Sequence, residues 1–175
     1  MQFACRVYFD FASADVWTFF RLLGAAAADG VELRTDWRPF VPGPESHDLM
    51  PPLAAYEAVR DRDPDRHGNF LLALLTAVHV EGKDPCDATT LAAAGELAGV
   101  DPAAIEAAGD YAEAVLASTA EARELGVSTT PSLYRHGPVL HVVLTPAALR
   151  GDAAARLQTI DVVLDDDAIW TLEKP

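Results

Sequence analysis

The 175-residue sequence is short of cysteines and of basic side chains. Its two cysteines, Cys5 and Cys86, form neither a Cys-x-x-Cys pair nor the spacing of a metal site. Thirteen Lys and Arg stand against 27 Asp and Glu, which gives a formal net charge of −14. Because nucleic acids and anionic membranes bind basic surfaces, we expect neither as a partner. Two free thiols are the simpler interpretation of the cysteines, and a disulfide between them stays open.

Long apolar runs are also missing. No run of about 18 apolar residues occurs, so we expect no transmembrane helix. Arg6 and Asp10 interrupt the first apolar stretch, which is unlike the core of a secretion signal. Half of the residues are hydrophobic, enough to bury a core without a metal ion or a disulfide. The composition therefore predicts one cytoplasmic domain that holds no metal.

Hydrophobic patterning predicts an α/β chain that opens strand–helix–strand. Residues 3–11 are predicted to form a buried strand, Ser13 to cap a helix that ends at 29–30, and residues 31–37 to form a second strand. A right-handed crossover should make the two strands parallel. The segment 39–52, rich in proline and polar residues, is predicted to be a loop.

The middle of the chain is predicted to be helical. Caps and apolar periodicity predict helices over residues 53–62, 69–80, 87–98 and 111–125, and a further helix that begins at 101. Strands at 132–134 and 139–144 flank a turn, and a helix over about 152–164 and an extended piece at 169–172 follow. This order predicts a single domain, 1–175, with an all-helical insertion at about 51–125.

Two segments resemble the DsbA family of thioredoxin-like proteins. Residues 7–17, Val-Tyr-Phe-Asp-Phe-Ala-Ser-Ala-Asp-Val-Trp, resemble the family's first strand, which ends in an aromatic–Asp pair before Cys-Pro-x-Cys. Residues 124–134, Glu-Leu-Gly-Val-Ser-Thr-Thr-Pro-Ser-Leu-Tyr, are similar to the segment that carries the family's cis-proline. The resemblance implies a thioredoxin-like fold with an inserted helical subdomain and a cis Thr130–Pro131 peptide. Residues 137–174 are similar to actinobacterial members, some of which depend on mycothiol.

The sequence departs from this family at its redox motif. Ser13, Ala14, Asp15 and Val16 stand where Cys-Pro-x-Cys would be. Dithiol exchange needs two sulfurs at a helix N-terminus, one of them a thiolate. Cys5 lies too far back along the chain to replace either, so we do not expect a dithiol–disulfide oxidoreductase.

Ser13 is the first candidate catalytic residue. It matches the first serine of the Ser-Pro-Tyr-Ser motif of 2-hydroxychromene-2-carboxylate isomerases and kappa-class glutathione transferases, a branch related to the FrnE-like proteins. The resemblance implies that the Ser13 hydroxyl stabilises the thiolate of bound glutathione or mycothiol. The alternative is that Ser13 only caps its helix.

Asp15 is the second candidate, as an acid, a base or a ligand of a cationic group. Its alternative is a solvated first-turn carboxylate, which would repel a docked thiolate.

Four further residues are candidates for binding the thiol or the substrate: Trp17, His79, Thr130 and Pro131. The resemblance implies that Thr130 offers its backbone to an extended thiol ligand. Trp17 either lines the cleft or packs in the core, and His79, on the apolar insertion helix, either faces the site or is a satisfied core histidine. We expect Ser13 to face a cleft with Thr130, Pro131 and Trp17, covered by the helical insertion.

Three classes of function remain. The sequence favours an isomerase or transferase that acts on a small organic substrate, with a low-molecular-weight thiol or with no cofactor. The alternative is a non-catalytic thioredoxin-like protein that binds a ligand or a partner. The third is a residual oxidoreductase that acts through one cysteine. A homodimer is left open.

Overall fold

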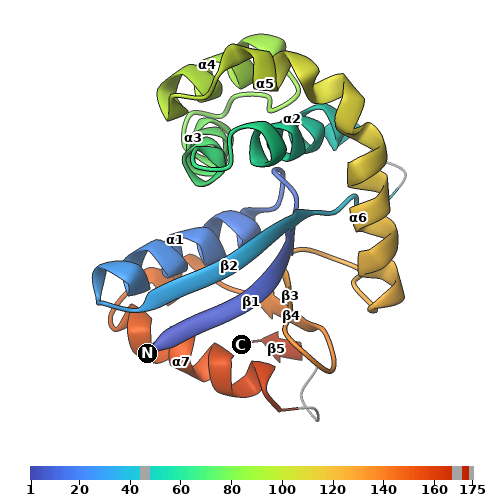
Figure 1. Cartoon of the computed structure of the whole chain (residues 1–175). Helices are drawn as coiled ribbons and strands as arrows, with labels where there is room; N and C mark the ends of the chain where they lie inside the picture. Colours follow the sequence, from blue (N-terminus) through green and yellow to red (C-terminus); the bar gives the residue numbers. More distant parts are fainter. Residues whose placement is uncertain (44–47, 167–170, 174–175) are drawn as a thin grey trace. The chain divides into compact units, whose positions relative to one another are not determined.

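The computed structural model describes residues 1–43, 48–166 and 171–173, and it divides into two compact units. The sheet unit comprises Met1–Phe9, Ser13–Arg38 and Ala122–Pro175, and the helical unit comprises Asp10–Ala12 and Pro39–Glu121. The helical unit corresponds to the insertion expected at about 51–125. The predicted α/β fold with an inserted helical subdomain is thereby confirmed (Figure 1).

The sheet unit is built on a five-stranded sheet in the order β2-β1-β3-β4-β5. The strands are β1 (Gln2–Phe9), β2 (Glu32–Pro39), β3 (Ser132–Tyr134), β4 (Leu140–Val143) and β5 (Thr171–Glu173). β3 is antiparallel to both β1 and β4, so that Leu133 lies opposite Val7 on one side and Leu140 on the other. All three side chains are buried, and this row forms the centre of the sheet's core.

Two helices cover the sheet. α1 (Ala14–Ala28) packs on α7 (Ala153–Leu164) and on the 3-10 turn η3 (Pro146–Leu149), and α7 also contacts β1. The predicted opening is confirmed: α1 connects β1 to β2, and Figure 1 shows these neighbouring strands running in the same direction. Of the extended piece predicted at 169–172, positions 169 and 170 lie outside the described residues, and β5 pairs parallel with β4.

The helical unit packs around α2 (Met50–Arg62). α3 (His67–His79), α5 (Pro102–Glu106) and η2 (Ala107–Tyr111) contact α2, and α4 (Ala88–Ala98) contacts α3 and α5. α6 (Ala112–Glu124) follows η2. The core of the helical unit is formed by fully buried aromatic and aliphatic side chains: Leu53, Tyr56, Phe70, Leu71 and Leu74. Asp87 caps α4 and Asp101 caps α5, as the sequence predicts.

Residues 44–47 of the predicted loop 39–52 lie outside the described residues, and at its other end the prediction is too long, since α2 already begins at Met50. Pro51 and Pro52 lie in the first turn of this helix. The amides of a first turn have no helical acceptor, so a residue without an N–H is tolerated there. Proline was therefore a misleading sign of a loop at these two positions.

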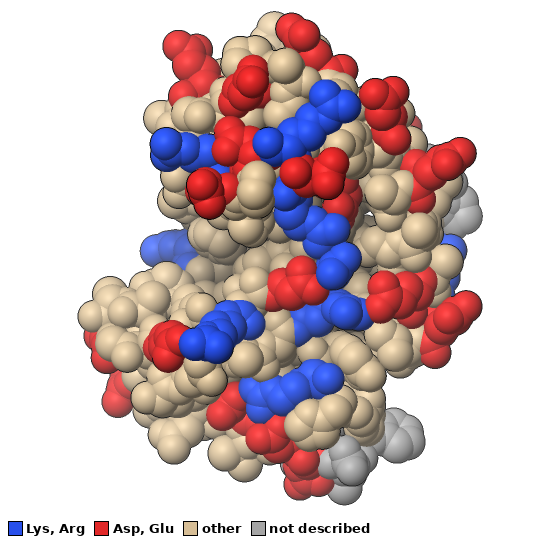
Figure 2. Space-filling view, viewed as in Figure 1, with Lys and Arg blue, Asp and Glu red and all other residues tan. Residues whose placement is uncertain are grey.

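Charged side chains of both signs occur on the surface of the molecule. Figure 2 shows acidic and basic side chains interspersed on the face it draws, with acidic ones spread over much of it. Among the described residues, no helix is both long enough and apolar enough to cross a membrane.

Candidate functional site

Ser13 is the N-cap of α1, as predicted. Its backbone is extended, and its Oγ accepts a hydrogen bond from the Val16 amide at 3.3 Å. The same hydroxyl donates to the Thr130 carbonyl at 3.2 Å, across 117 residues of sequence. The start of α1 and the segment before Pro131 are therefore tied together within the sheet unit, as the resemblance implied.

The Thr130–Pro131 peptide bond is cis, and both residues are buried. The Pro131 carbonyl accepts two hydrogen bonds from β4, from the Val142 amide at 3.2 Å and from His141 Nδ1 at 3.1 Å. A carbonyl only accepts, so His141 carries its proton on Nδ1. No local pattern in the sequence marks this role of His141, which lies opposite Ser132 in the pairing of β3 with β4.

The other two predicted residues of α1 lie near its start. Asp15 is half-buried in the first turn, where its negative charge is favourable to the helix dipole. The Trp17 ring is half-buried, stacks on Phe20 with centroids 6.5 Å apart, and lies 5.7 Å from the Arg21 guanidinium carbon. Trp17 is thus held on the flank of α1 and is not a core residue.

A cavity of about 380 Å³ opens in the sheet unit. Ser132 and His141 lie in its wall together with Leu125, Gly126, Ser128, Pro138 and Val139. The Ser132 hydroxyl donates to the Thr129 carbonyl at 2.7 Å and His141 Nδ1 donates to the Pro131 carbonyl, and among the described residues no hydrogen bond joins the two side chains. This wall therefore lacks the arrangement of a serine nucleophile.

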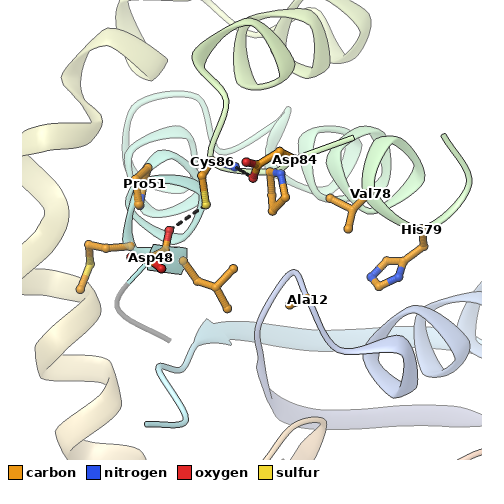
Figure 3. Close-up of a pocket in the computed structure, with 10 residues that line it drawn as sticks. Ala12, Asp48, Pro51, Val78, His79, Asp84 and Cys86 are labelled. Carbon is orange, nitrogen blue, oxygen red and sulfur yellow. Dashed lines mark hydrogen bonds between the residues drawn. The ribbon is translucent and has the colours of Figure 1, made fainter. Parts of the chain in front are cut away.

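A larger cavity, about 890 Å³, lies in the helical unit and contains His79, one of the predicted binding residues (Figure 3). His79 Nε2 is 3.0 Å from the Phe11 carbonyl, which places a proton on Nε2. Burial lowers the pKa of His79 below 6.5, so the ring is neutral at pH 7. This hydrogen bond makes His79 a satisfied histidine, as the alternative interpretation expected. Because His79 also lies in a cavity wall, it is accessible to a ligand as well.

The two cysteines are free, so the disulfide left open by the sequence is not formed. Burial raises the pKa of the Cys5 thiol to about 12. Burial and the nearby carboxylates of Asp84 and Asp48 raise that of Cys86 to about 11. Neither sulfur is a thiolate at pH 7, and a protonated thiol is a poor nucleophile.

The predicted site residues thus fall into two groups. Ser13, Asp15, Trp17, Thr130 and Pro131 lie in the sheet unit, and His79 lies in the helical unit. Covering of Ser13 by the helical insertion stays a prediction. Within the described ranges, no group of three or more His, Cys, Asp or Glu side chains is arranged to hold a metal ion.

No family model matches this chain, and no curated protein matches it. Solved structures do match its fold. A candidate protein disulfide isomerase from Nitrosomonas europaea has a TM-score of 0.67 at 14% identity and covers 94% of this chain and 100% of its own. The cytosolic disulfide reductase DsbM from Pseudomonas aeruginosa, with GSH, has a TM-score of 0.62 at 19% identity, covering 90% and 98%. DsbA from Mycobacterium tuberculosis has 0.61 at 19%, covering 88% of both chains. The chain therefore has the DsbA-like thioredoxin fold with a helical insertion.

Proposed function

We propose that this protein is an isomerase or transferase that holds a low-molecular-weight thiol at Ser13 and uses it on a small organic substrate. The observation that carries the proposal is the 3.2 Å contact between Ser13 Oγ and the Thr130 carbonyl. A hydroxyl donor at a helix start lies beside the backbone of the cis-proline segment, where thiol ligands bind in thioredoxin-like proteins. Glutathione and mycothiol are the two thiols we propose.

The chemistry follows from the start of α1. The first amides of a helix and its dipole favour a negative charge, and they would lower the pKa of a thiol docked there. A serine hydroxyl rotates freely, so its proton can turn from the Thr130 carbonyl to a bound sulfur. The resulting thiolate would add to an electrophilic carbon of a C=C bond, and the π electron pair would move to the neighbouring carbon. After bond rotation, this pair re-forms the double bond and expels the thiolate, which gives an isomer. Protonation of the neighbouring carbon, or loss of a leaving group such as chloride, leaves the sulfur bound and gives a conjugate.

Asp15 sets a condition on this mechanism. Its carboxylate lies in the same first turn and would oppose a thiolate at short range. We propose that Asp15 instead moves a proton on the substrate or binds a cationic group of the thiol. Trp17, beside it on the flank of α1, would offer an apolar surface to the substrate.

One further observation supports a thiol as the cofactor, and others bear on the location and on the oxidoreductase alternative. The similar reductase from Pseudomonas aeruginosa is described with GSH, so a protein of this fold accommodates glutathione. That protein is also described as cytosolic, and we propose a cytoplasmic location for this chain too. The raised pKa values of Cys5 and Cys86 disfavour the residual oxidoreductase, because neither residue supplies a thiolate at neutral pH.

One observation favours the non-catalytic alternative. The Ser13 hydroxyl already accepts from Val16 and donates to Thr130, which is sufficient for a purely structural role. In that case the cis-proline segment would bind a ligand or a partner without acting on it. The two functions differ in what the loss of the hydroxyl does to a bound thiol.

The test measures thiol binding and thiol ionisation together. Glutathione and mycothiol are titrated by calorimetry into the wild type, Ser13→Ala and Ser13→Thr, and the pKa of the bound thiol is read from thiolate absorbance. Asp152→Ala is the matched control, since it removes the N-cap of α7 in the same unit. If Ser13 donates to sulfur, Ser13→Ala should weaken thiolate binding roughly 10- to 150-fold, the size of a hydrogen bond to a charged group.

Activity is followed with 1-chloro-2,4-dinitrobenzene as an electrophilic probe. Ser13→Thr and Asp152→Ala should keep conjugation, and Ser13→Ala should lose most of it. Failure of both thiols to bind the wild type would overturn the proposal. Binding that is equally tight in Ser13→Ala, with an unshifted thiol pKa, would leave the non-catalytic protein as the function.

A further inference from the structure

The cavity of the helical unit supports a second inference, which does not use Ser13 or the proposed thiol. All of its described wall residues belong to this one unit. Its volume of about 890 Å³ is in the range of sites for small organic molecules.

Part of the wall is apolar. Leu49, Met50 and Pro51 come from the start of α2, and Val78 comes from the end of α3. Pro85 faces the cavity from the turn that precedes α4. These side chains offer a surface for the hydrocarbon body of a ligand, and methionine adapts to different shapes.

The charged groups of the wall have one sign. Asp48 and Asp84, which are 36 residues apart in the sequence, both line the cavity and are exposed. No Lys or Arg occurs among the described wall residues. The nearest lysine in sequence, Lys83, pairs with Glu81 at 2.7 Å. The wall is therefore negative.

Its remaining polar groups do not offset this charge. His79 is neutral at pH 7, because burial lowers its pKa, and its Nε2–H is donated to the Phe11 carbonyl. Cys86 Sγ donates to the Asp48 carbonyl at 2.7 Å, and the Cys86 amide donates to the Asp84 carboxylate at 2.8 Å (Figure 3). Burial raises the pKa of this thiol, and the two carboxylates raise it further.

We propose that this cavity binds small organic cations, ammonium compounds with an apolar body, and rejects organic anions of the same shape. Asp48 and Asp84 attract the ammonium group, while the proline, valine and methionine side chains contact the hydrocarbon. Because both carboxylates are exposed, each changes affinity only several-fold. Exchanging a cation for an anion reverses both contributions, so the expected preference is about tenfold or more.

Cys86 lies in the wall, so the rate at which reagents label its thiol measures the charge preference of the cavity. This experiment needs no known ligand. Cys86 is labelled with cationic 2-(trimethylammonio)ethyl methanethiosulfonate or anionic 2-sulfonatoethyl methanethiosulfonate, and the site is identified by mass spectrometry. In both reactions the protein sulfur forms a disulfide and methanesulfinate leaves. We expect the cation-to-anion rate ratio, normalised to a free thiol, to be at least about tenfold. It should approach one in the Asp48→Asn/Asp84→Asn variant, in which asparagine keeps the acceptor oxygen.

Glu96→Gln is the matched control, because it removes one exposed carboxylate from α4 that does not raise the Cys86 pKa. Its rate ratio should equal that of the wild type. A ratio near one in the wild type, or a high ratio that survives in Asp48→Asn/Asp84→Asn, would overturn the charge argument.

Binding is measured with benzylamine, benzyl alcohol and benzoate as probes of one shape and different charge. Each is tested for protection of Cys86 against neutral iodoacetamide. Benzylamine should protect at a concentration about tenfold or more below benzoate, and the double asparagine variant should lose this difference. Equal protection by benzoate, or no protection by benzylamine, would refute the site. Ser13→Ala should leave all of these results unchanged, so failure here is distinguishable from failure of the thiol proposal.

Discussion

Removing the Ser13 hydroxyl should cost more stability than removing an ordinary helix cap. Two hydrogen bonds are lost in Ser13→Ala, the one from the Val16 amide and the one to the Thr130 carbonyl. The cap contributes about 1 kcal/mol and the second bond about another 1 kcal/mol. For a chain of 175 residues, about 2 kcal/mol corresponds to a fall in Tm of roughly 4–8 °C.

Asp152→Ala isolates the cap contribution. Asp152 accepts from the Ala155 amide at 2.8 Å at the start of α7, and its side chain makes no second bond to any described residue of the kind that Ser13 makes to Thr130. Its loss should therefore cost about 1 kcal/mol, or roughly 2–4 °C. Ser13→Thr keeps a hydroxyl at the cap and should stay near the wild type.

Calorimetry and urea unfolding of the three variants give the comparison. If Ser13→Ala and Asp152→Ala are destabilised equally, the bond from Ser13 to Thr130 contributes nothing, and the reasoning that ties α1 to the cis-proline segment is refuted. That result would also weaken the proposed site, because the same contact carries it.

Three other predictions concern single residues. Cys86, with a pKa of about 11, should react with iodoacetamide at pH 8 about 100-fold more slowly than a thiol of pKa 9.0, and its rate should rise about tenfold per pH unit up to that value; a plateau near pH 9 would contradict it. The lowered pKa of His79 means that the unfolded chain binds the proton more readily, so stability should fall as the pH drops from 6.5 through the folded pKa. His79→Gln should remove that part of the fall in the urea midpoint, and an unchanged pH profile would refute it. Gly99 ends α4 at φ 70°, where a Cβ is unfavourable. Gly99→Ala should therefore lower the free energy of unfolding in urea by about 1 kcal/mol. A neutral effect would contradict the left-handed cap.

The sequence predicts the elements of this fold well because their causes are local. Asp87 and Asp101 precede helices that they cap, and Gly99 follows one that it ends. Strand and helix periodicities are equally local. Pro51 was misleading for the same reason, since proline favours both a loop and a first helical turn, and the choice between them depends on packing.

Most of the candidate site could not be predicted from local patterns. The contact of Ser13 with Thr130 was expected only through a family resemblance, because no periodicity relates residues so far apart. No local pattern indicated His141 or the two carboxylates, Asp48 and Asp84, that line one cavity. Their importance comes from which segments the fold brings together, and no motif marks such pairs in a single sequence.

Arg135 provides a last prediction, because it joins three parts of the sheet unit. Its Nε donates to the Ala4 carbonyl in β1 at 2.7 Å, and its two terminal nitrogens donate to Asp161 and Asp165, each at 2.5 Å. Lysine keeps the charge but has one nitrogen, which cannot reach three acceptors that diverge from a planar guanidinium. The Arg135 and Asp161 side chains are 21% and 24% exposed, so Arg135→Lys should cost about 2 kcal/mol in urea unfolding. Asp165 is 52% exposed, so Asp165→Asn should cost less than about 1 kcal/mol and lose that effect in high salt. If Arg135→Lys costs no more than Asp165→Asn, the guanidinium geometry adds nothing beyond its charge, and the link between β1 and α7 must come from apolar packing alone.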